Sequence, residues 1–392
     1  MGSTISLSVG RFEIEWGKNS LFRSHAKLFL PGDLKPVAYY YAHDCGDGIR
    51  ETKPAFRRTL QSVRKRLSLL GYSIARCQQI YEQNMAHAQT YEGVHPISWP
   101  DFVKTVCEID LACADTSSLD DDCDPGEYAA RHVLEGTPLE ELAPTDWLSK
   151  RSLGLTLENL DPYVTLRILA EEPRNRRKSV IWRHADVLEG GWIEEADVTH
   201  SLSAEDRYLI VTEGSSDSAI LRKSLDLLFP DVADFFDFID MSEHYPFTGT
   251  GSLVNFCMGL ARIGIQNKVL VVFDNDTAGR EAMDRLKDVP LPEHMKLTTL
   301  PSMDRLRRFR TLGPTGSMCE DVNGTAASIE LYLDLRYGGP KKPAVRWTSY
   351  SDRVGAYQGA LVRKEEYARA FLKGASAKGY SLKGLRAIWT AL

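Results

Sequence analysis

The sequence predicts an α/β domain built on a parallel sheet, preceded by an α+β domain. The apolar run Val269–Phe273 has the length and β-branched composition of a strand buried on both faces, as in parallel sheets. A similar run, Tyr208–Thr212, lies about one α/β repeat earlier, and each run is followed by carboxylates, a glycine and a helical pattern. Residues 1–145 instead show strand-like alternation followed by helical apolar spacing.

Carboxylates follow both predicted strands. Glu213 and Asp217 follow the first strand, and Asp274 and Asp276 follow the second. The carboxyl ends of parallel strands meet at the edge of the sheet where ligands bind. Carboxylates gathered there must raise their pKa values or hold a divalent cation, so we expect one or two Mg²⁺ or Mn²⁺ ions. Taken alone, each cluster is equally well explained by helix capping, with Asp276 or Ser216 as the N-cap.

The two acidic motifs resemble a known family. Glu213-Gly-Ser-Ser-Asp217 followed by Asp274-Asn-Asp276-Thr-Ala-Gly279 resembles the Toprim domain of primases, topoisomerases, OLD-family nucleases and small nucleases. The resemblance implies a Rossmann-like Toprim fold over residues 205–340, with Glu213, Asp274 and Asp276 as catalytic metal ligands. The Asp-x-Asp-x-Ala-Gly form is similar to primases, whereas residues 319–331 are closer to nuclease-type members, which add a carboxylate on a helix. This implies Glu330 as a further catalytic residue, with Asp217, Asp321 or Glu330 completing the metal shell.

Small and basic residues near these motifs predict contacts with phosphate. Glycines let the backbone approach a ligand, and the free N–H groups of a helix N-terminus favour a phosphate. An ordinary Gly-rich turn with Ser252 as N-cap explains the same pattern. The basic stretch 304–310 either grips a nucleic-acid backbone or is a solvated helix face. The candidate residues for phosphate or nucleic-acid binding are Gly249, Gly251, Ser252, Arg280, Arg307, Arg308 and Arg310.

Positive charge is concentrated in a basic C-terminal extension, residues 341–392. This segment has eleven Lys and Arg residues against three acidic ones, whereas the whole chain has a formal net charge of −6. A local positive footprint in an acidic chain is what phosphate binding requires. We therefore expect nucleic acid, DNA or RNA, as a partner.

The N-terminal module is predicted to span residues 1–200, as a β-hairpin unit (1–50), a helical part (51–145, with the helical spacing starting at Pro54) and a connecting segment (146–204). The hairpin is expected to turn at Gly10-Arg11. The opening residues 1–19 resemble a module joined to HEPN or Toprim nuclease domains in bacterial defence proteins. The resemblance implies a regulatory role, through a trigger, a protein partner or a homodimer. Arg177 and His184 have the loose spacing of HEPN ribonucleases, but such pairs are common by chance, and we expect two surface residues.

The remaining composition excludes several classes. Seven cysteines without a Cys-x-x-Cys pair make a zinc ribbon a poor interpretation and fit a reduced cytoplasm. No signal peptide or apolar run of membrane-spanning length is present, so we expect a cytoplasmic protein without membrane contact. The acidic loop 115–126 lacks the glycine and the closing glutamate of an EF-hand.

Together these features predict a Mg²⁺-dependent nuclease, an effector in bacterial anti-phage defence. A primase or topoisomerase-like DNA-processing enzyme would use the same metals, but a primase normally brings a zinc ribbon and a topoisomerase needs a nucleophilic tyrosine. The third interpretation is a non-catalytic nucleic-acid-binding or scaffold component.

Overall fold

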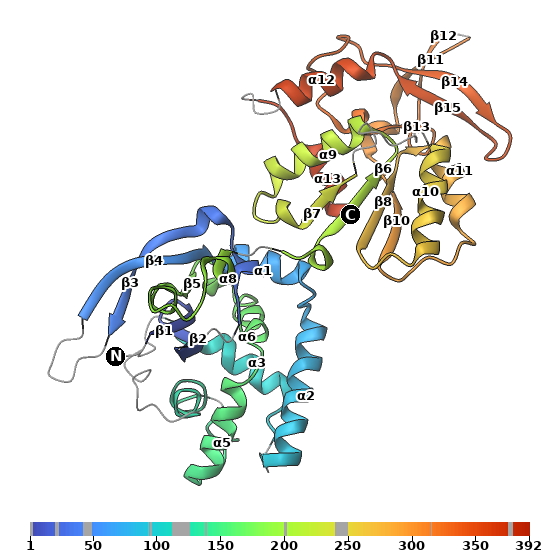
Figure 1. Cartoon of the computed structure of the whole chain (residues 1–392). Helices are drawn as coiled ribbons and strands as arrows, with labels where there is room; N and C mark the ends of the chain where they lie inside the picture. Colours follow the sequence, from blue (N-terminus) through green and yellow to red (C-terminus); the bar gives the residue numbers. More distant parts are fainter. Residues whose placement is uncertain are drawn as a thin grey trace. The chain divides into compact units, whose positions relative to one another are not determined.

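The computed structural model forms two compact units, Met1–Ser201 and Leu202–Leu392 (Figure 1). Each unit has its own hydrophobic core. The structure describes residues 3–19, 23–41, 49–92, 94, 96–111, 126–137, 139–199, 202–239, 250–314, 316–374 and 379–392.

The first unit is built around an antiparallel five-stranded sheet with the order β2-β1-β5-β4-β3. Its central strand comes from the end of the unit, so the helices between β4 and β5 in sequence are inserted between neighbouring strands of the sheet. Gly10 forms the turn between β1 and β2 as expected, with a φ of +63° that favours glycine. The strands are β1 (Thr4–Val9), β2 (Phe12–Lys18), β3 (Leu34–Tyr41), β4 (Ile49–Thr59) and β5 (Ser179–Arg183).

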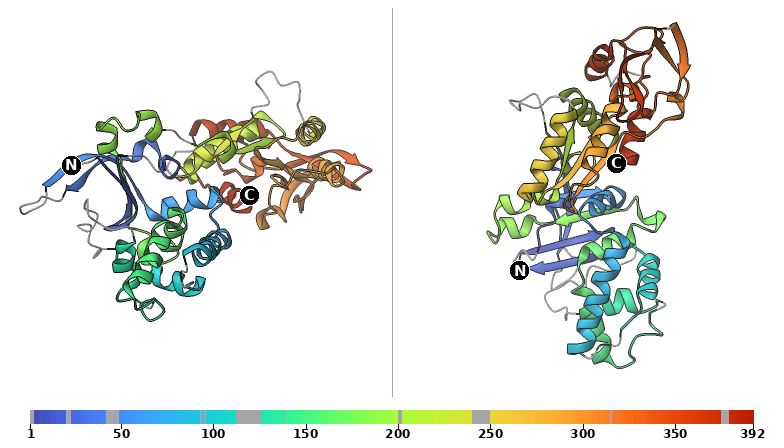
Figure 2. Two further views of the ribbon diagram at one scale, coloured as in Figure 1. Left: turned by 60° about the horizontal axis from the view of Figure 1, so that its bottom comes forward. Right: turned by 90° about the vertical axis from the view of Figure 1, so that its right-hand side faces the viewer.

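Helices cover both faces of this sheet (Figure 2, left). Trp182 is fully buried on one face, where its ring stacks with Phe29 and Phe56. On the other face Ala185 of α7 packs against Val37. The unit contains α1 (Leu60–Leu69), α2 (Ile74–Glu92), α3 (Trp99–Glu108), α4 (Glu127–Ala129), α5 (Trp147–Glu158), α6 (Pro162–Leu169), α7 (Ala185–Glu189) and α8 (Glu195–Thr199). Short 3₁₀ turns (Ala26–Leu28, Pro31–Asp33, Pro173–Asn175) and a π turn (Ala130–Leu134) connect them.

One boundary in this unit differs from the prediction. Helical structure was expected from Pro54, but β4 continues to Thr59 because its last five residues pair with β5. Only then does α1 begin, with the Thr59 side chain accepting a hydrogen bond from the Ser62 backbone. Tertiary strand pairing therefore overrides the local helical spacing.

The second unit contains the predicted parallel sheet. Its order is β10-β8-β6-β7, and every pair is parallel. Helix α9 packs on one face and α10 and α11 pack on the other, which buries the apolar runs from both sides (Figure 1). The strands are β6 (Tyr208–Thr212), β7 (Phe236–Phe238), β8 (Lys268–Phe273) and β10 (Met295–Thr299), and the helices are α9 (Ser215–Leu228), α10 (Thr250–Ile263) and α11 (Thr277–Leu286). Three 3₁₀ turns (Ala204–Asp206, Ala233–Phe235 and Asp304–Leu306) flank the sheet.

The rest of the second unit adds a smaller sheet and two helices. The sheet has the order β12-β11-β14-β15, and a two-stranded pair joins β13 to β9. Residues 341–392 supply β14, β15, α12 and α13, and Phe371 and Ile388 belong to the same core as Leu221 of α9. The elements are β9 (Asn275–Asp276), β11 (Phe309–Gly313), β12 (Gly316–Glu320), β13 (Ala326–Ala327), a 3₁₀ turn (Ile329–Tyr332), β14 (Val345–Ser351), β15 (Ala356–Leu361), α12 (Lys364–Gly374) and α13 (Lys383–Ala391).

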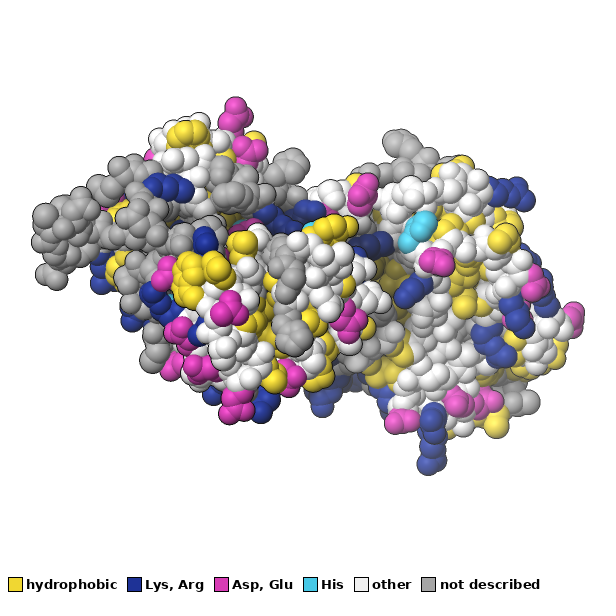
Figure 3. All heavy atoms as spheres, turned by 90° about the horizontal axis from the view of Figure 1, so that it is seen from below, with side chains coloured by type: hydrophobic (Ala, Val, Ile, Leu, Met, Phe, Trp, Pro, Cys, Tyr) yellow, Lys and Arg dark blue, Asp and Glu magenta, His cyan; other side chains and the backbone are white. Residues whose placement is uncertain are grey.

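The surface has a mixed character. The face drawn in Figure 3 carries basic and acidic side chains interspersed, in keeping with the small net charge of −6. Among the described residues, no helix has the length and apolar character needed to cross a membrane.

Candidate metal centre

The carboxyl ends of β6 and β8 bring Glu213 and Asp274 together. The two strands pair in parallel with Thr212 opposite Val272, so the residues that follow them leave the sheet at the same edge. The backbone N–H of Asp274 donates a hydrogen bond to Glu213 Oε1 at 3.2 Å. The first two predicted metal ligands are therefore neighbours in space.

Asp217 lies in the first turn of α9, close to the end of β6. Its Oδ2 accepts a hydrogen bond from the backbone of Gly214 at 3.0 Å, and its Oδ1 lies 3.3 Å from the Ser216 hydroxyl. The carboxylate thus caps the helix start and still belongs to the acidic edge of the sheet.

Asp276 is the N-cap of α11, as the capping interpretation proposed. Its Oδ1 accepts the Gly279 N–H at 2.8 Å, and its Oδ2 accepts Gln358 Nε2 of β15 at 2.6 Å. A side chain at Gly279 would meet the Asp274 carbonyl oxygen at 2.1 Å, which explains the glycine in this motif. Capping and proximity to the acidic edge are therefore combined in one residue.

Glu330 reaches the same edge from a 3₁₀ turn, not from the predicted helix. The preceding backbone N–H, that of Ile329, donates to Asp274 Oδ1 at 3.1 Å. The Ser328 hydroxyl donates to Glu330 Oε2 at 2.7 Å, and the glutamate is only 2% exposed. We call Glu213, Asp217, Asp274, Asp276 and Glu330 the carboxylate cluster.

Burial and mutual repulsion raise the pKa values of four members of this cluster. Burial raises the pKa of Asp274 well above its usual value, and the charges of Asp217 and Glu213 raise it further. Burial, with the charges of Glu330 and Glu213, raises the pKa of Asp217 to about 7. Burial is also the main cause of the raised pKa values of Glu213 and Asp276. The cluster therefore favours protons or a cation in its midst.

Lys364, at the start of α12, supplies positive charge to the cluster. The pKa of this half-buried lysine is raised mainly by the charge of Glu330, and also by Asp274 and Asp217. In turn, the lysine lowers the pKa values of Glu213, Asp217 and Asp276. The single positive charge of Lys364 is smaller than the negative charge that five ionised carboxylates would carry. The cluster can therefore still bind a cation.

The donor set of the cluster fits a hard divalent cation. It consists of oxygen ligands only, the type that Mg²⁺ and Mn²⁺ prefer. Among the described residues no three His, Cys, Asp or Glu side chains already stand in a metal-binding geometry. Several cluster oxygens are held by protein donors, so a metal would have to draw them inward.

Two further carboxylates near Glu330 in the sequence, Asp321 and Glu320, bind partners outside the cluster. Asp321 is exposed, and its carboxylate accepts hydrogen bonds from the backbone and the amide of Asn323. It is not among the charges that raise the pKa values of the cluster. Glu320, from the same stretch, binds Thr311 and Trp347 instead.

The start of α10 lies at the cluster. The Thr250 hydroxyl donates to Glu213 Oε2 at 2.7 Å. Gly251 and Ser252 occupy the first turn of this helix, while Gly249 lies outside the described residues. Backbone N–H groups at this helix end would therefore face a ligand bound at the carboxylates.

The predicted arginines are largely at the surface. Arg280 on α11 is exposed, and its guanidinium lies 3.4 Å from the Gly324 carbonyl oxygen. Arg307 and Arg308 are exposed, with Arg307 3.3 Å from Asp304, and Arg310 donates to the Ser317 hydroxyl. Such exposed pairs contribute little to stability, which leaves these side chains available to phosphate.

Sequence reasoning missed Gln358, Lys364 and Thr250. Gln358 holds Asp276 from 82 residues further along the chain, and its Oε1 also accepts the Ala278 N–H at 2.9 Å. No spacing rule could connect residues so far apart. For Lys364 the sequence showed only the general excess of Lys and Arg in residues 341–392.

The family comparison bears on the first half of the chain. A family model described as HEPN/Toprim N-terminal domain 1 matches residues 1–206. The chain belongs to this family. Searches among curated proteins and among solved structures gave no match.

Arg177 and His184, which have the loose spacing of HEPN ribonucleases, lie in different environments in this HEPN/Toprim N-terminal domain 1. Arg177 is exposed as expected, but His184 is 3% exposed, so the prediction of a surface histidine is wrong. The His184 ring stacks on Phe56, and burial lowers its pKa. Because β5 directs this side chain into the core, its role here is packing.

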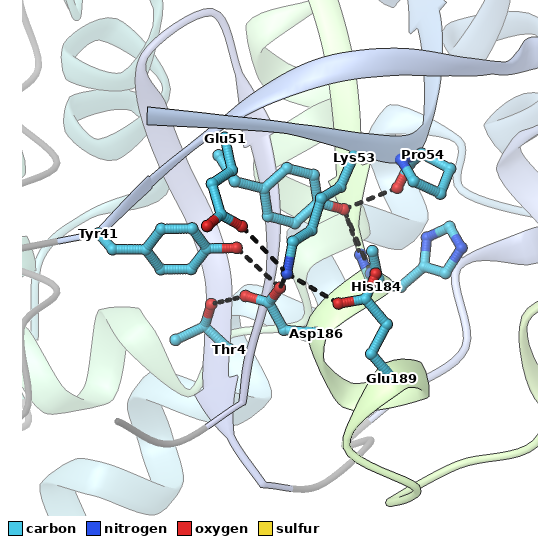
Figure 4. A network of polar contacts seen from close by, with 10 residues as sticks. Thr4, Tyr41, Glu51, Lys53, Pro54, His184, Asp186 and Glu189 are labelled. Carbon is cyan, nitrogen blue, oxygen red and sulfur yellow. Dashed lines mark hydrogen bonds and ion pairs between the residues drawn. The ribbon is translucent and has the colours of Figure 1, made fainter. Parts of the chain in front are cut away.

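A polar network joins α7 to the sheet of this HEPN/Toprim N-terminal domain (Figure 4). Lys53 Nζ of β4 lies 2.8 Å from both Asp186 and Glu189 of α7. The buried Asp186 also accepts the Tyr41 hydroxyl at 2.8 Å and the Thr4 hydroxyl at 2.9 Å. The lysine and both carboxylates of this network are paired, so the network fastens α7 to three strands.

Proposed function

We propose that this chain is a Mg²⁺- or Mn²⁺-dependent nuclease whose second unit is a Toprim-type domain. The observation that carries the proposal is the carboxylate cluster itself. Five carboxylates and one lysine meet at the carboxyl edge of a parallel sheet, beside the first turn of a helix. Such an arrangement is costly for stability and is retained where the charges serve a ligand.

The residues that would hold a cation are Asp274, Glu213 and Asp217, with Glu330 available for a second ion. A bound divalent cation would polarise a phosphodiester and lower the barrier to attack by water. Asp276 would take part through its Oδ2, which Gln358 holds in place. Asp321 is left out of this set because it binds Asn323 instead.

The chain's own groups would position the nucleic acid. Lys364 carries a positive charge beside Glu330, where it could meet a phosphate oxygen or the leaving oxygen. The N–H groups at the start of α10 would hold an adjacent phosphate. Glu213 holds its proton to a higher pH than an ordinary glutamate, because burial raises its pKa, which suits a proton-transfer role.

For the first unit we propose regulation. Its family is named for HEPN and Toprim proteins, which supports a nuclease-related or DNA-processing context. Exposed Trp147 (60%), Leu148 (67%) and Trp192 (55%) offer apolar surface to a protein partner or a second copy. A trigger acting through this unit would suit an effector in bacterial anti-phage defence.

The test is a cleavage assay on plasmid, single-stranded DNA and total tRNA in Mg²⁺, Mn²⁺ or chelator. Changing Asp274 and Asp276 together to Asn should abolish divalent-dependent cleavage. Asparagine is a good N-cap, so α11 should keep its start and the fold should survive. Asp284→Asn, an exposed site on the same helix, is the matched control and should cleave normally. Cleavage by the double variant at the wild-type rate would end the proposal.

A further inference from the structure

A pair of tyrosines stands out on the smaller sheet of the second unit. Tyr350 of β14 lies opposite Tyr357 of β15, so both side chains are on one face of the sheet. Their rings are 4.9 Å apart and meet edge to face, and they are 52% and 58% exposed. Two large aromatic rings side by side in solvent form a surface to which a planar group can bind.

Trp347 extends this surface toward the core. Its ring lies 6.2 Å from that of Tyr357 and is half-buried. Its indole N–H donates to Glu320 Oε2 at 3.1 Å, which fixes the ring. The apolar packing of this hairpin is provided by Val345 and Leu361, which are 0% and 3% exposed. The exposed tyrosines are therefore not needed for the packing of the core.

The hairpin that carries the tyrosines is tied to the carboxylate cluster. Gln358, the residue after Tyr357, donates to Asp276, and the Tyr357 carbonyl accepts the Thr277 hydroxyl at 2.7 Å. Near the hairpin turn, the Ser351 hydroxyl donates to Glu281 of α11 at 3.1 Å. The hairpin that carries the two rings is thus anchored beside the carboxylate cluster.

The charge of the segments that form the smaller sheet suits phosphates. Residues 305–320 and 341–363, which include the four strands of this sheet, hold nine Lys and Arg residues against Glu320 and Asp352. Arg346 and Arg353 are exposed on the tyrosine hairpin itself. In a chain of net charge −6, this local excess favours a polyanion over an acidic protein surface such as that of a second copy.

We propose that unpaired nucleobases stack on Tyr350 and Tyr357, so that the substrate of the proposed nuclease is single-stranded nucleic acid. The inference rests on the proposed function for the chemistry at the cluster, but the stacking surface can be tested without cleavage. Only unpaired bases expose the faces that stack on aromatic rings, because a duplex covers them with the neighbouring pairs. Every base has such a face, so we expect little dependence on base sequence.

The experiment measures binding in chelator, where cleavage is absent, by fluorescence anisotropy of labelled single strands and of the matching duplex. Tyr350→Ala with Tyr357→Ala should weaken single-strand binding about 10- to 100-fold and leave duplex binding unchanged. The double Tyr→Phe variant keeps both rings and should bind single strands as the wild type does. Thermal unfolding of both variants reports whether the hairpin stays folded.

Several outcomes overturn the inference. Equal losses for single strand and duplex would assign the rings to general packing, and unchanged affinity would remove them from binding altogether. A change of oligomeric state in the alanine variant, seen by light scattering, would make this face an interface between copies. Cleavage of duplex, together with unchanged binding by the variants, would overturn the stacking inference and leave the proposed function standing. Ring-dependent single-strand binding without any cleavage would support the stacking surface and contradict the proposed function.

Discussion

The substitution Asp217→Asn tests whether repulsion within the carboxylate cluster destabilises the metal-free protein and whether a bound cation removes this effect. Asparagine keeps an oxygen for the Gly214 N–H but removes one negative charge. At pH 8 the ionised Asp217 lowers the free energy of unfolding of the wild-type protein, because burial and the neighbouring carboxylates disfavour its charge. We therefore expect the metal-free variant to be more stable than the wild type.

The magnitude follows from the pKa of Asp217, which the fold raises from 3.8 to about 7. At roughly 1.4 kcal/mol per pH unit, this difference corresponds to a ceiling of about 4 kcal/mol. The side chain is half-buried, so solvent screens part of the repulsion, and we expect a gain of about 1–3 kcal/mol.

The sign of the pH dependence is fixed by the direction of the shift. Because the folded protein holds the Asp217 proton more tightly than the unfolded chain, this group costs nothing below pH 3.8 and its full cost appears as the pH rises through about 7. The gain from Asp217→Asn should therefore be large at pH 8 and small at pH 4.5.

Urea unfolding in chelator at these two pH values measures the effect, and the same series in Mg²⁺ should reduce the difference between the proteins. Asp226→Asn, an exposed site on the same helix, changes the net charge equally and should be neutral. A gain no larger than that of the control, or one that is larger at pH 4.5, would refute the repulsion argument.

Three further predictions concern the same unit. Glu330→Gln should lower hydrolysis by orders of magnitude with substrate binding largely kept, as a second-metal ligand requires, and near-wild-type rates would limit this residue to an electrostatic role. Gln358→Leu should raise the Mg²⁺ concentration needed for half-maximal activity, with Gln358→Glu as a variant that keeps the shape but adds repulsion; an unchanged metal requirement would leave it only a helix-capping role. Replacing Arg307, Arg308 and Arg310 with Gln should flatten the salt dependence of nucleic-acid binding, measured as the slope of log affinity against log salt. An unchanged slope would assign these arginines to a solvated face.

The sequence alone determined the parallel sheet and its acidic edge. The run Val269–Phe273 is short, rich in β-branched residues and apolar at consecutive positions, which is typical of a strand covered on both faces, and the structure confirms the parallel sheet. Strand polarity then requires Glu213 and Asp274 to leave at the same edge. This much follows from local period and chain direction, and no long-range information is needed.

Tertiary structure decided which other groups join that edge. Glu330 was expected on a helix, but a 3₁₀ turn held by the Ser328 hydroxyl and by Asp274 presents it. Gln358 and Lys364 arrive from a second sheet and from a later helix, and spacing along the chain carries no trace of these contacts. The physical reason is that a side chain's local period fixes only the face on which it lies, whereas its partner across the fold depends on how separate elements pack.

The first unit shows the same division. The alternation around Gly10 was sufficient to predict the β1–β2 hairpin, because a turn and its two strands are neighbours in sequence. The end of β4 at Thr59 and the burial of His184 were not predictable, since both depend on β5, which joins the centre of the sheet only after about 120 further residues. Pairing with that distant strand supplied the backbone hydrogen bonds that extended β4 beyond its local helical signal and turned His184 into the core.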